Sequence, residues 1–350
     1  MKILLIRFSS LGDVVLASAA VEALREDRPD AEVHVLTKPA FREVFWGNPG
    51  VAELVKWEPG EGLPALARRL RAQRYDAVAD LHANLRTRLL RFLVPSPRWT
   101  RYAKGSLRRR VAVAMGGPGL LGEVHVVDRY LKALAPLGVR PIRRLPRLYP
   151  GVAERTRARS LLSEAGRRPE ELVVALAPSA RWPTKAWPQK HWQELLRELS
   201  GLAPGVFPVL VGGAGDRALC AAILGAERGA DLAGKTSVLE TAAVLEEARV
   251  LVSNDSAPLH LANAVGTPAV ALFGPTVRGF GFYPLGPRDV VLEQALPCRP
   301  CSLHGGERCP EGHHRCLAEI PVGSVRDAAF RALEESGGTG PGERGSRGTC

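Results

Sequence analysis

Short apolar runs alternate with stretches of helical spacing along most of the chain. In the first 50 residues, Ile3 to Ile6 is apolar like a buried strand, Leu11 to Leu24 has helical spacing, and Val33 to Leu36 is again strand-like. Such alternation is typical of βαβ units, whose strands pair in a parallel sheet with helices on its faces. The pattern therefore predicts an α/β fold built on parallel sheets.

An interval rich in proline and arginine, Gly138 to Gly151, interrupts this alternation, and the same pattern restarts beyond it. A chain of 350 residues exceeds the size at which one hydrophobic core usually stops growing. We therefore expect two tandem domains, residues 1–150 and 151–320, then a helix within residues 321–335 and a disordered Gly-, Ser- and Arg-rich tail over residues 336–350. Ligands of open α/β sheets bind beyond the carboxyl ends of the strands, so two such domains in tandem predict a ligand cleft between them.

The elements predicted after the interruption follow from apolar runs and helical spacing. They are strands at Val173–Leu176, Val206–Val211, Val250–Val252 and Ala269–Phe273, and helices at Pro188–Leu199, Asp216–Glu227, Ser237–Ala248, Ser256–Val265 and Val322–Glu335.

The net charge of +12 is unevenly distributed. Residues 1–150 hold 26 Lys and Arg against 14 Asp and Glu, whereas residues 151–350 hold 22 of each sign. Forty of the 48 basic residues are arginine, whose planar guanidinium suits phosphate and carboxylate groups. A GC-rich genome that favours arginine explains the choice of residue but not its confinement to one half. We therefore favour an anionic partner held by the first domain.

No apolar run approaches the roughly 20 residues that are needed to span a bilayer. Arg7 and Asp13 interrupt the N-terminal apolar stretch where a signal peptide would be continuous. We expect a cytoplasmic protein.

The segment SNDSAPLHLANAVGTPAVALFGPT, residues 253–276, joins the end of a predicted strand to a helix start. Free N–H groups and the helix dipole at such a start favour a diphosphate, and Ser256 and His260 add a hydroxyl and an imidazole. Asp255 would be repelled by phosphate, so we expect it to accept from a sugar or ribose hydroxyl or from backbone N–H groups. The alternative is that Asp255 or Ser256 only caps the helix and that His260 is a core residue.

Two further turns lie at predicted carboxyl ends of strands. The loop from Pro178 to Pro188 places Thr184 and Lys185 where they could neutralise a diphosphate, with Trp182 or Trp187 as a pocket wall; an exposed loop with tucked tryptophans is the alternative. In the first βα turn, Gly12 allows close backbone approach. Asp13 there either complements the helix dipole or takes a proton from an attacking hydroxyl.

Four cysteines, Cys298, Cys301, Cys309 and Cys316, lie within 19 residues. Their density suggests a structural zinc site, although the outer spacings are not those of a standard zinc pair; plain thiols or a redox-formed staple are the alternative. The segment Gly212-Gly213-Ala214-Gly215 does not make the Gly-x-Gly-x-x-Gly of a dinucleotide fold, and the chain has no Asp-x-Asp of a metal-chelating diphosphate site.

Taken together, LIRFSSLGDVV, PSARWPTKAWP and SNDSAPLHLANAVGTPAVALFGPT resemble glycosyltransferase family 9, the ADP-heptose heptosyltransferases of bacterial lipopolysaccharide assembly. The likeness covers most of residues 1–320 and keeps the motif order. It implies a GT-B fold: two Rossmann-like domains face each other across a cleft, the first binds the acceptor and the second the nucleotide-sugar donor. The resemblance also implies that the helix from Val322 to Glu335 crosses back to the first domain.

Within this resemblance, Asp13 is similar to the catalytic base of the family, with Ser10 and Gly12 shaping its loop. Asn84 and Arg86 fall on the acceptor side of the first domain.

On the donor side, the resemblance assigns Thr184 and Lys185 to the loop whose lysine stabilises the diphosphate. Asp255, Ser256 and His260 match the donor motif, and Asp216 falls near an acidic position that meets the nucleoside in relatives. Ala257 departs from the family, where glycine is common.

The implied reaction is an inverting, metal-independent glycosyl transfer that needs no cofactor beyond an ADP-heptose-like co-substrate. Asp13 deprotonates a hydroxyl of an anionic glycolipid or lipopolysaccharide core at the cytoplasmic face of the inner membrane. The hydroxyl attacks the anomeric carbon while Lys185 and the helix start stabilise the departing diphosphate.

Two alternatives stay open. One is a transferase of the same fold that uses another nucleotide-sugar, and the other is a non-catalytic protein that binds nucleic acid or anionic lipid. The presence of Asp13, Lys185 and His260 together argues against the second, and the Arg-rich stretch lacks the interleaved aromatic residues of a nucleic-acid surface, so we expect no nucleic-acid partner. The sequence predicts no oligomeric state.

Overall fold

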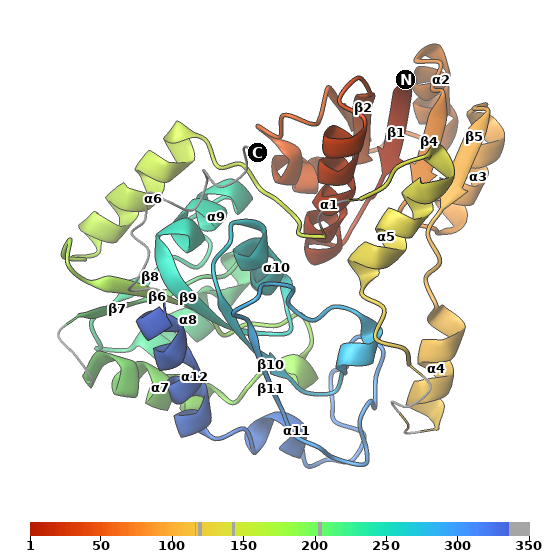
Figure 1. Ribbon diagram of the computed structural model, residues 1–350. Helices are drawn as coiled ribbons and strands as arrows, with labels where there is room; N and C mark the ends of the chain where they lie inside the picture. The colour runs from red at the N-terminus through yellow and green to blue at the C-terminus, as the bar shows by residue number, and fades with distance from the viewer. Residues whose placement is uncertain (116, 118–120, 142–143, 202–204, 336–350) are drawn as a thin grey trace. The chain divides into compact units, whose positions relative to one another are not determined.

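The computed structural model describes the chain except residues 116, 118–120, 142–143, 202–204 and 336–350 (Figure 1). The described residues within Met1–Arg109, Leu121–Tyr149 and Gly279–Phe282 form one compact unit. Those within Arg110–Leu120, Pro150–Arg278 and Tyr283–Cys350 form a second unit. The chain passes from the first unit to the second next to the predicted boundary, but the described residues within Arg110–Leu120 already belong to the second unit, which departs from the continuous predicted range 1–150. The expected tail over residues 336–350 lies outside the described residues.

The first unit is built on a parallel sheet with strand order β3-β2-β1-β4-β5. Its strands are β1 (Lys2–Ile6), β2 (Glu32–Thr37), β3 (Glu53–Lys56), β4 (Ala77–Asp80) and β5 (Arg98–Arg101). Its helices are α1 (Leu11–Asp27), α2 (Leu63–Ala72), α3 (Leu85–Leu93) and α5 (Val126–Leu134), and α4 (Ser106–Ala114) follows β5.

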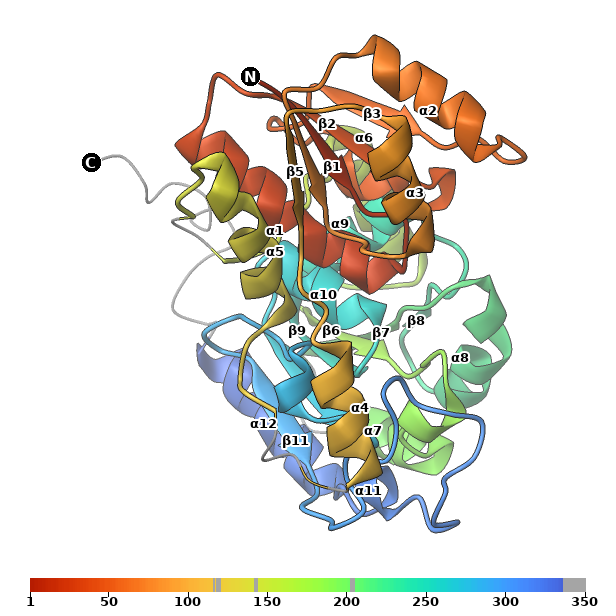
Figure 2. The same cartoon turned by 90° about the vertical axis from the view of Figure 1, so that its right-hand side faces the viewer.

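β1 lies at the centre of this sheet, where Ile3 pairs with Val33 of β2 and with Ala77 of β4. Helices α1 and α5 pack on one face of the sheet and α2 and α3 on the other (Figure 2). A strand covered on both faces must be apolar on both, which is why β1 is a continuous apolar run in the sequence. α1 is buried from Val14 to Leu24 for the same reason, since the sheet and α5 both cover it.

The edge strands β3 and β5 are not predicted from the sequence. They read Glu-Leu-Val-Lys and Arg-Trp-Thr-Arg, so charged residues begin and end each of them. Charges are a usual feature of edge strands, because they oppose pairing with another chain. The same feature removes the apolar run by which a central strand is recognised.

The second unit is built on a parallel sheet with strand order β11-β10-β9-β6-β7-β8. Its strands are β6 (Leu172–Ala177), β7 (Val206–Leu210), β8 (Ala230–Asp231), β9 (Ala248–Asn254), β10 (Ala269–Phe273) and β11 (Val290–Glu293). Its helices are α6 (Val152–Glu164), α7 (Gln189–Gly201), α8 (Arg217–Leu224), α9 (Val238–Glu247), α10 (Ala257–Ala264), α11 (Arg315–Ala318) and α12 (Val322–Glu335).

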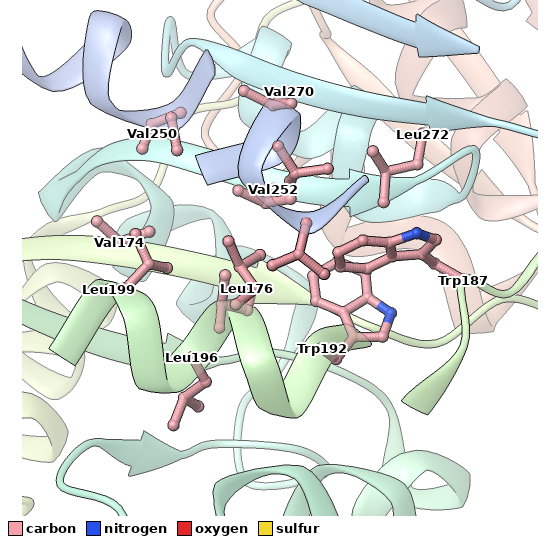
Figure 3. Packing of buried hydrophobic residues seen from close by; sticks show 14 of the residues in the cluster. Val174, Leu176, Trp187, Trp192, Leu196, Leu199, Val250, Val252, Val270 and Leu272 are labelled. Carbon is pink, nitrogen blue, oxygen red and sulfur yellow. The ribbon is translucent and has the colours of Figure 1, made fainter. Parts of the chain in front are cut away.

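Two tryptophans anchor the core on the α7 and α12 face of the second sheet (Figure 3). Trp187 and Trp192 meet edge to face, with ring centroids 5.2 Å apart and planes at 85°. Val174, Val252 and Leu272 of three neighbouring strands belong to the same cluster. Aromatic pairs of this geometry contribute about 0.5–1.5 kcal/mol beyond the area that they bury.

The predicted helix from Val322 to Glu335 forms as α12, and it packs in the second unit, where we expected a helix that crosses back to the first domain. Its buried residues include Val325, Ala328, Ala329 and Ala332, which lie on one side of the helix and join the core of the second unit. α12 packs on α7, β9 and β10. The apolar side of α12 therefore assigns it to the second domain, which corrects the expectation.

A short segment of the later chain, Gly279–Phe282, belongs to the first unit rather than to the second. The backbone N–H of Val126 donates to the carbonyl of Gly281 at 2.9 Å. Gly281 has φ +81°, and a Cβ there would lie 2.5 Å from the carbonyl oxygen of Val124. Only glycine permits this close approach, so the continuous predicted range 151–320 for the second domain is corrected at this segment.

Candidate functional site

The turn between β1 and α1 holds Asp13 in a fixed position. Ser10 directs both its backbone N–H and its hydroxyl to Asp13 Oδ2, at 3.2 and 2.8 Å. Asp13 Oδ1 lies 2.7 Å from a guanidinium nitrogen of Arg7, and the Asp13 side chain keeps 20% of its surface exposed. The turn thus presents a carboxylate that is oriented by Ser10 and Arg7 and partly open to a ligand.

Arg7 is an almost completely buried cation, 5% exposed. Its Nη1 donates to the carbonyl of Leu81 at 2.6 Å, and its guanidinium carbon lies 5.6 Å from the ring centroid of Tyr130 and 6.0 Å from that of Tyr102. Burial alone would lower the pKa of Arg7, but Tyr130, Asp13 and Tyr102 raise it above its ordinary value. Arg7 therefore keeps its charge and holds the Asp13 carboxylate.

His82 follows β4 and borders the same region, where its ring and that of Phe8 are tilted against each other with centroids 5.0 Å apart. Burial, with smaller contributions from Arg7 and Lys104, lowers the pKa of His82 to about 4. His82 is therefore neutral near pH 7. Neither Arg7 nor His82 is singled out by the sequence; a charged residue at the end of a buried strand, six positions before an acid, is the signal that would have found Arg7.

The two residues expected on the acceptor side lie at the start of α3. Asn84 caps this helix, because its Oδ1 accepts from the backbone N–H of Thr87 at 3.0 Å. Arg86 is exposed and stands over the ring of Trp57, 5.6 Å from its centroid. Arg86, Trp57 and Lys38 line part of a hollow of about 590 Å³ that follows the carboxyl ends of β2 and β3. Arg86 thus borders a space at the ligand edge, whereas Asn84 has a structural role.

In the second unit, Lys185 and Asp255, which come from two separate motifs, form an ion pair. Lys185 Nζ lies 2.5 Å from Asp255 Oδ2, with side chains 14% and 8% exposed. The hydroxyl of Thr276 donates to the same carboxylate oxygen at 2.7 Å. Both contacts are made by Oδ2 of Asp255; the expected contact of Asp255 with a sugar or ribose hydroxyl or with backbone N–H groups stays a prediction.

Thr276 is the last residue of the predicted donor segment, and the sequence assigns it no role. It follows β10, which pairs with β9 in a register that sets Leu272 beside Asn254. Residues beyond the carboxyl ends of adjacent parallel strands lie near one another. That adjacency is the signal that would have paired Thr276 with Asp255.

Thr184 is held by backbone contacts. Its hydroxyl donates to the carbonyl of Gly306 at 2.9 Å and accepts from the N–H of Gly306 at 2.7 Å, and its own carbonyl lies 2.9 Å from His314 Nε2. Thr184 is buried. These contacts give Thr184 a role in anchoring the lysine-bearing turn, Pro183–Lys185, where we expected a diphosphate contact.

Asn254 ties this turn to the end of β9. Its side-chain amide donates to the carbonyl of Pro178 at 2.7 Å and accepts from the backbone N–H of Trp187 at 3.1 Å. Trp187 is 2% exposed and donates from its indole to the carbonyl of Ile320. The prediction that Trp187 lines a pocket is therefore corrected: its ring is part of the core, and Trp182 stays the candidate wall residue.

α10 begins where the donor motif predicted a helix start. Ser256 is its N-cap residue, with extended backbone, and Pro258 sits in its first turn. The Ser256 hydroxyl lies 3.5 Å from that of Ser253, and His260 is 5% exposed within the helix. Ser256 and His260 therefore occupy the predicted helix start, in the turn that follows Asp255.

Asp216 has a local role. Its Oδ2 accepts from the backbone N–H of Gly213 at 2.7 Å. A Cβ at Gly212 would come within 2.9 Å of the Asp216 side chain, so glycine is required at this turn. Asp216 thus stabilises the turn after β7, and its expected contact with a nucleoside stays a prediction.

The predicted zinc site finds no support in the structure. Among the described residues, no group of three or more His, Cys, Asp or Glu is arranged to hold a metal ion. Cys298, Cys301, Cys309 and Cys316 are free thiols. Burial raises the pKa of Cys316 to about 11, because the thiol joins the core under Gly274.

The described helices include none that is long and apolar enough to cross a membrane.

Comparison with known proteins agrees with the sheets and the motifs. Residues 63–309 match the model of glycosyltransferase family 9 (heptosyltransferase), so the chain belongs to this family. Lipopolysaccharide heptosyltransferase 2 of Salmonella typhimurium is 28% identical over an alignment that covers 96% of this chain and 100% of the relative.

Two solved structures share the architecture of both units. A family 9 glycosyltransferase from Veillonella parvula superposes with a TM-score of 0.80 at 23% identity, covering 96% of this chain and 98% of the other. The Escherichia coli ADP-heptose lipopolysaccharide heptosyltransferase II gives a TM-score of 0.73 at 25% identity, covering 96% and 99%. The fold is GT-B, with two Rossmann-like parallel-sheet domains, as the sequence predicted.

Proposed function

We propose that this protein transfers a heptose from ADP-heptose to a hydroxyl group of the lipopolysaccharide core. Family membership supports glycosyl transfer, and the similar enzymes whose names state an activity are lipopolysaccharide heptosyltransferases. The observation that carries the proposal within this chain is the paired charge of Lys185 and Asp255 beside the helix start at Ser256. The second domain is the donor domain in this proposal, and the first domain binds the acceptor.

Lys185 acts on the leaving group. Its ammonium is held by Asp255 in a site where both side chains are largely buried. A diphosphate carries more negative charge than one carboxylate, so a bound donor competes with Asp255 for Lys185. Negative charge on the diphosphate grows as the glycosidic bond breaks, and a cation positioned beforehand stabilises that transition state more than the ground state.

Asp13 is the general base. Its carboxylate is paired with Arg7 and oriented by Ser10. It takes the proton of the acceptor hydroxyl as the oxygen attacks the anomeric carbon, and the nucleoside diphosphate leaves from the opposite face. The anomeric configuration is therefore inverted. The ammonium of Lys185 and the backbone N–H donors at the start of α10 serve the diphosphate without a metal ion in the reaction.

The acceptor is anionic and lies at the cytoplasmic face of the inner membrane. The surplus of basic residues in residues 1–150 supports an anionic acceptor. Arg86 and Lys38, at the hollow beside β2 and β3, are the acceptor-side cations that we assign first.

Thermal shift with ADP, UDP, GDP and their sugars tests the donor. We expect ADP and ADP-heptose to raise the melting temperature, because ligands that bind only the folded state stabilise it. The matched pair of variants is Lys185→Met and Lys190→Met, since Lys190 is exposed on α7 of the same domain. The shift should shrink in the first and persist in the second.

Stabilisation by UDP or GDP alone would show that the donor is a nucleotide-sugar other than ADP-heptose. The protein would still be a glycosyltransferase. Absence of a shift with every nucleotide would refute the transferase. The stereochemistry is read separately, from the anomeric signal of the product by NMR; a retained configuration would refute the role of Asp13 as base.

A further inference from the structure

Helix α3 carries apolar side chains on its solvent-facing side. Leu85 is 70% exposed, Leu89 46% and Phe92 83%. These positions are spaced by four and three residues, so they form one stripe along the helix. Proteins that need no partner seldom leave such a continuous apolar stripe in water.

The stripe is opposite the face by which α3 is packed. Thr87 and Leu90 are buried, and Val94 directly after the helix is buried too. At about 100° per residue, the stripe centres roughly 170° from that buried face. The stripe is therefore not an extension of the core.

Arginines flank the stripe on both sides. Arg86 lies on one side and Arg88 and Arg91 on the other, and all three are exposed. α3 contains no acidic residue. An apolar stripe between cationic flanks is the pattern of helices that lie in a membrane interface, where apolar groups enter the acyl boundary and cations meet anionic headgroups.

Helix α4 shows the same arrangement independently. Leu107 is 74% exposed and Val111 36%, and Met115 directly after the helix is 72% exposed. Arg108 and Arg110 are exposed beside this stripe, and α4 likewise has no acidic residue. The pattern is thus repeated in a second helix whose sequence differs.

A shallow hollow of about 440 Å³ adjoins the end of α3. It is lined by Arg91, Ser96 and Trp99, with Pro95 and Pro97. The Trp99 indole donates to the carbonyl of Val94 at 3.2 Å, which fixes the ring. A guanidinium, a hydroxyl and an aromatic ring beside a hollow of this size suit one phosphate headgroup with its glycerol.

We propose that Leu85, Leu89 and Phe92 of α3, with Arg88 and Arg91 beside them, dock this protein on a bilayer that contains anionic lipid. Charge complementarity selects the occupant, because both stripes are flanked by arginine alone and a protein groove would need matching acidic groups. This inference rests on the proposed function in one respect, since a glycolipid acceptor lies in a bilayer.

Vesicle flotation with the full chain tests the surface. The vesicles are phosphatidylethanolamine with phosphatidylglycerol, and phosphatidylcholine alone serves as the uncharged comparison. The test variant carries Leu85→Gln, Leu89→Gln and Phe92→Gln, which leave the packed face of α3 unchanged. The control is Val152→Gln, an 81% exposed apolar residue on α6.

We expect the wild type and the control to float with the anionic vesicles and the triple variant to lose at least tenfold in partition coefficient. Replacing Arg88 and Arg91 by Gln should weaken the binding and reduce its dependence on salt. Equal partitioning of the triple variant and the wild type would overturn the proposal, as would equal binding to both kinds of vesicle.

A second measurement does not depend on the triple variant folding. In Phe92→Trp, brominated lipid should quench the fluorescence of the introduced indole, beyond any quenching of the wild type, if the stripe enters the acyl boundary. If brominated lipid quenches the fluorescence of Phe92→Trp no more than that of the wild type, the proposal is wrong. If the triple variant changes oligomeric state in size-exclusion chromatography but floats like the wild type, the stripe is a protein interface and the proposal is wrong.

An assay of sugar transfer to a soluble, lipid-free acceptor separates membrane docking from the proposed function. The triple variant should keep that activity while transfer to a vesicle-bound acceptor falls. If the wild type transfers sugar to neither acceptor, the proposed function is refuted, whereas the result of the vesicle binding still stands.

Discussion

Replacement of Lys185 by methionine tests whether its charge serves the donor or only neutralises Asp255. The ammonium and carboxylate lie 2.5 Å apart, where two unit charges attract by roughly 7 kcal/mol at an effective dielectric constant of about 20. Desolvation of two largely buried groups offsets much of this attraction, and Thr276 continues to donate to Asp255. We expect Lys185→Met to reduce the free energy of unfolding by about 3 kcal/mol, or roughly 6–12 °C in melting temperature.

The double variant Lys185→Met/Asp255→Asn separates stability from catalysis. Removing both charges removes the uncompensated buried carboxylate, so the melting temperature should return to within about 3 °C of the wild type. Turnover should stay about 10²- to 10³-fold below the wild type, because the preorganised cation is still missing. Scanning calorimetry and a coupled assay for released nucleotide provide the two readouts, with Lys190→Met as the exposed-lysine control. Recovery of turnover in the double variant would refute a direct role of Lys185 in the reaction.

Three further changes give distinct readouts. Asp13→Asn should lower turnover by about 10²- to 10⁴-fold while calorimetric ADP affinity stays unchanged; wild-type turnover would exclude Asp13 as the base. Gly274→Ala places a Cβ 2.7 Å from Leu317 Cγ and should cost about 1–3 kcal/mol through overpacking, measured by urea unfolding; an unchanged midpoint would show that Leu317 moves freely. The pKa of His82 in the folded state is about 4, so the unfolded state binds the proton first and the free energy of unfolding falls as pH drops from about 6.5 towards 4. In urea titrations, the free energy of unfolding of His82→Phe should depend less on pH in this range. An unchanged pH dependence would assign the effect to other groups.

The candidate site is predicted unevenly from the sequence. Asp13, Lys185 and Asp255 can be singled out because each follows an apolar strand in a recognisable turn, and the carboxyl ends of parallel strands are where ligands bind. The contacts that these turns make with distant segments are not visible in the turn sequences themselves. Asp255 meets Thr276, 21 residues away, and Thr184, in the turn of Lys185, meets Gly306, 122 residues away.

The structure shows local contacts of two site candidates that their loop sequences do not reveal. Trp187 is a predicted wall residue because its loop follows a strand, but its ring fits the core beside Trp192. Asp216 caps its own turn. Whether a side chain points into a core or towards a ligand depends on the packing of several elements, which a single loop sequence does not contain.

Local sequence is sufficient for the parallel α/β architecture, for the division near Tyr149 and for the turns that carry the charged residues, because these depend on periodicity and on glycine and proline in the turns. Packing in three dimensions is what assigns α12 to the second domain, brings Arg7 to Asp13 and binds Lys185 to Asp255. Local propensity determines whether a segment forms a helix, a strand or a turn. Burial determines which charged side chains must form ion pairs, since an unpaired ion inside a protein costs several kcal/mol.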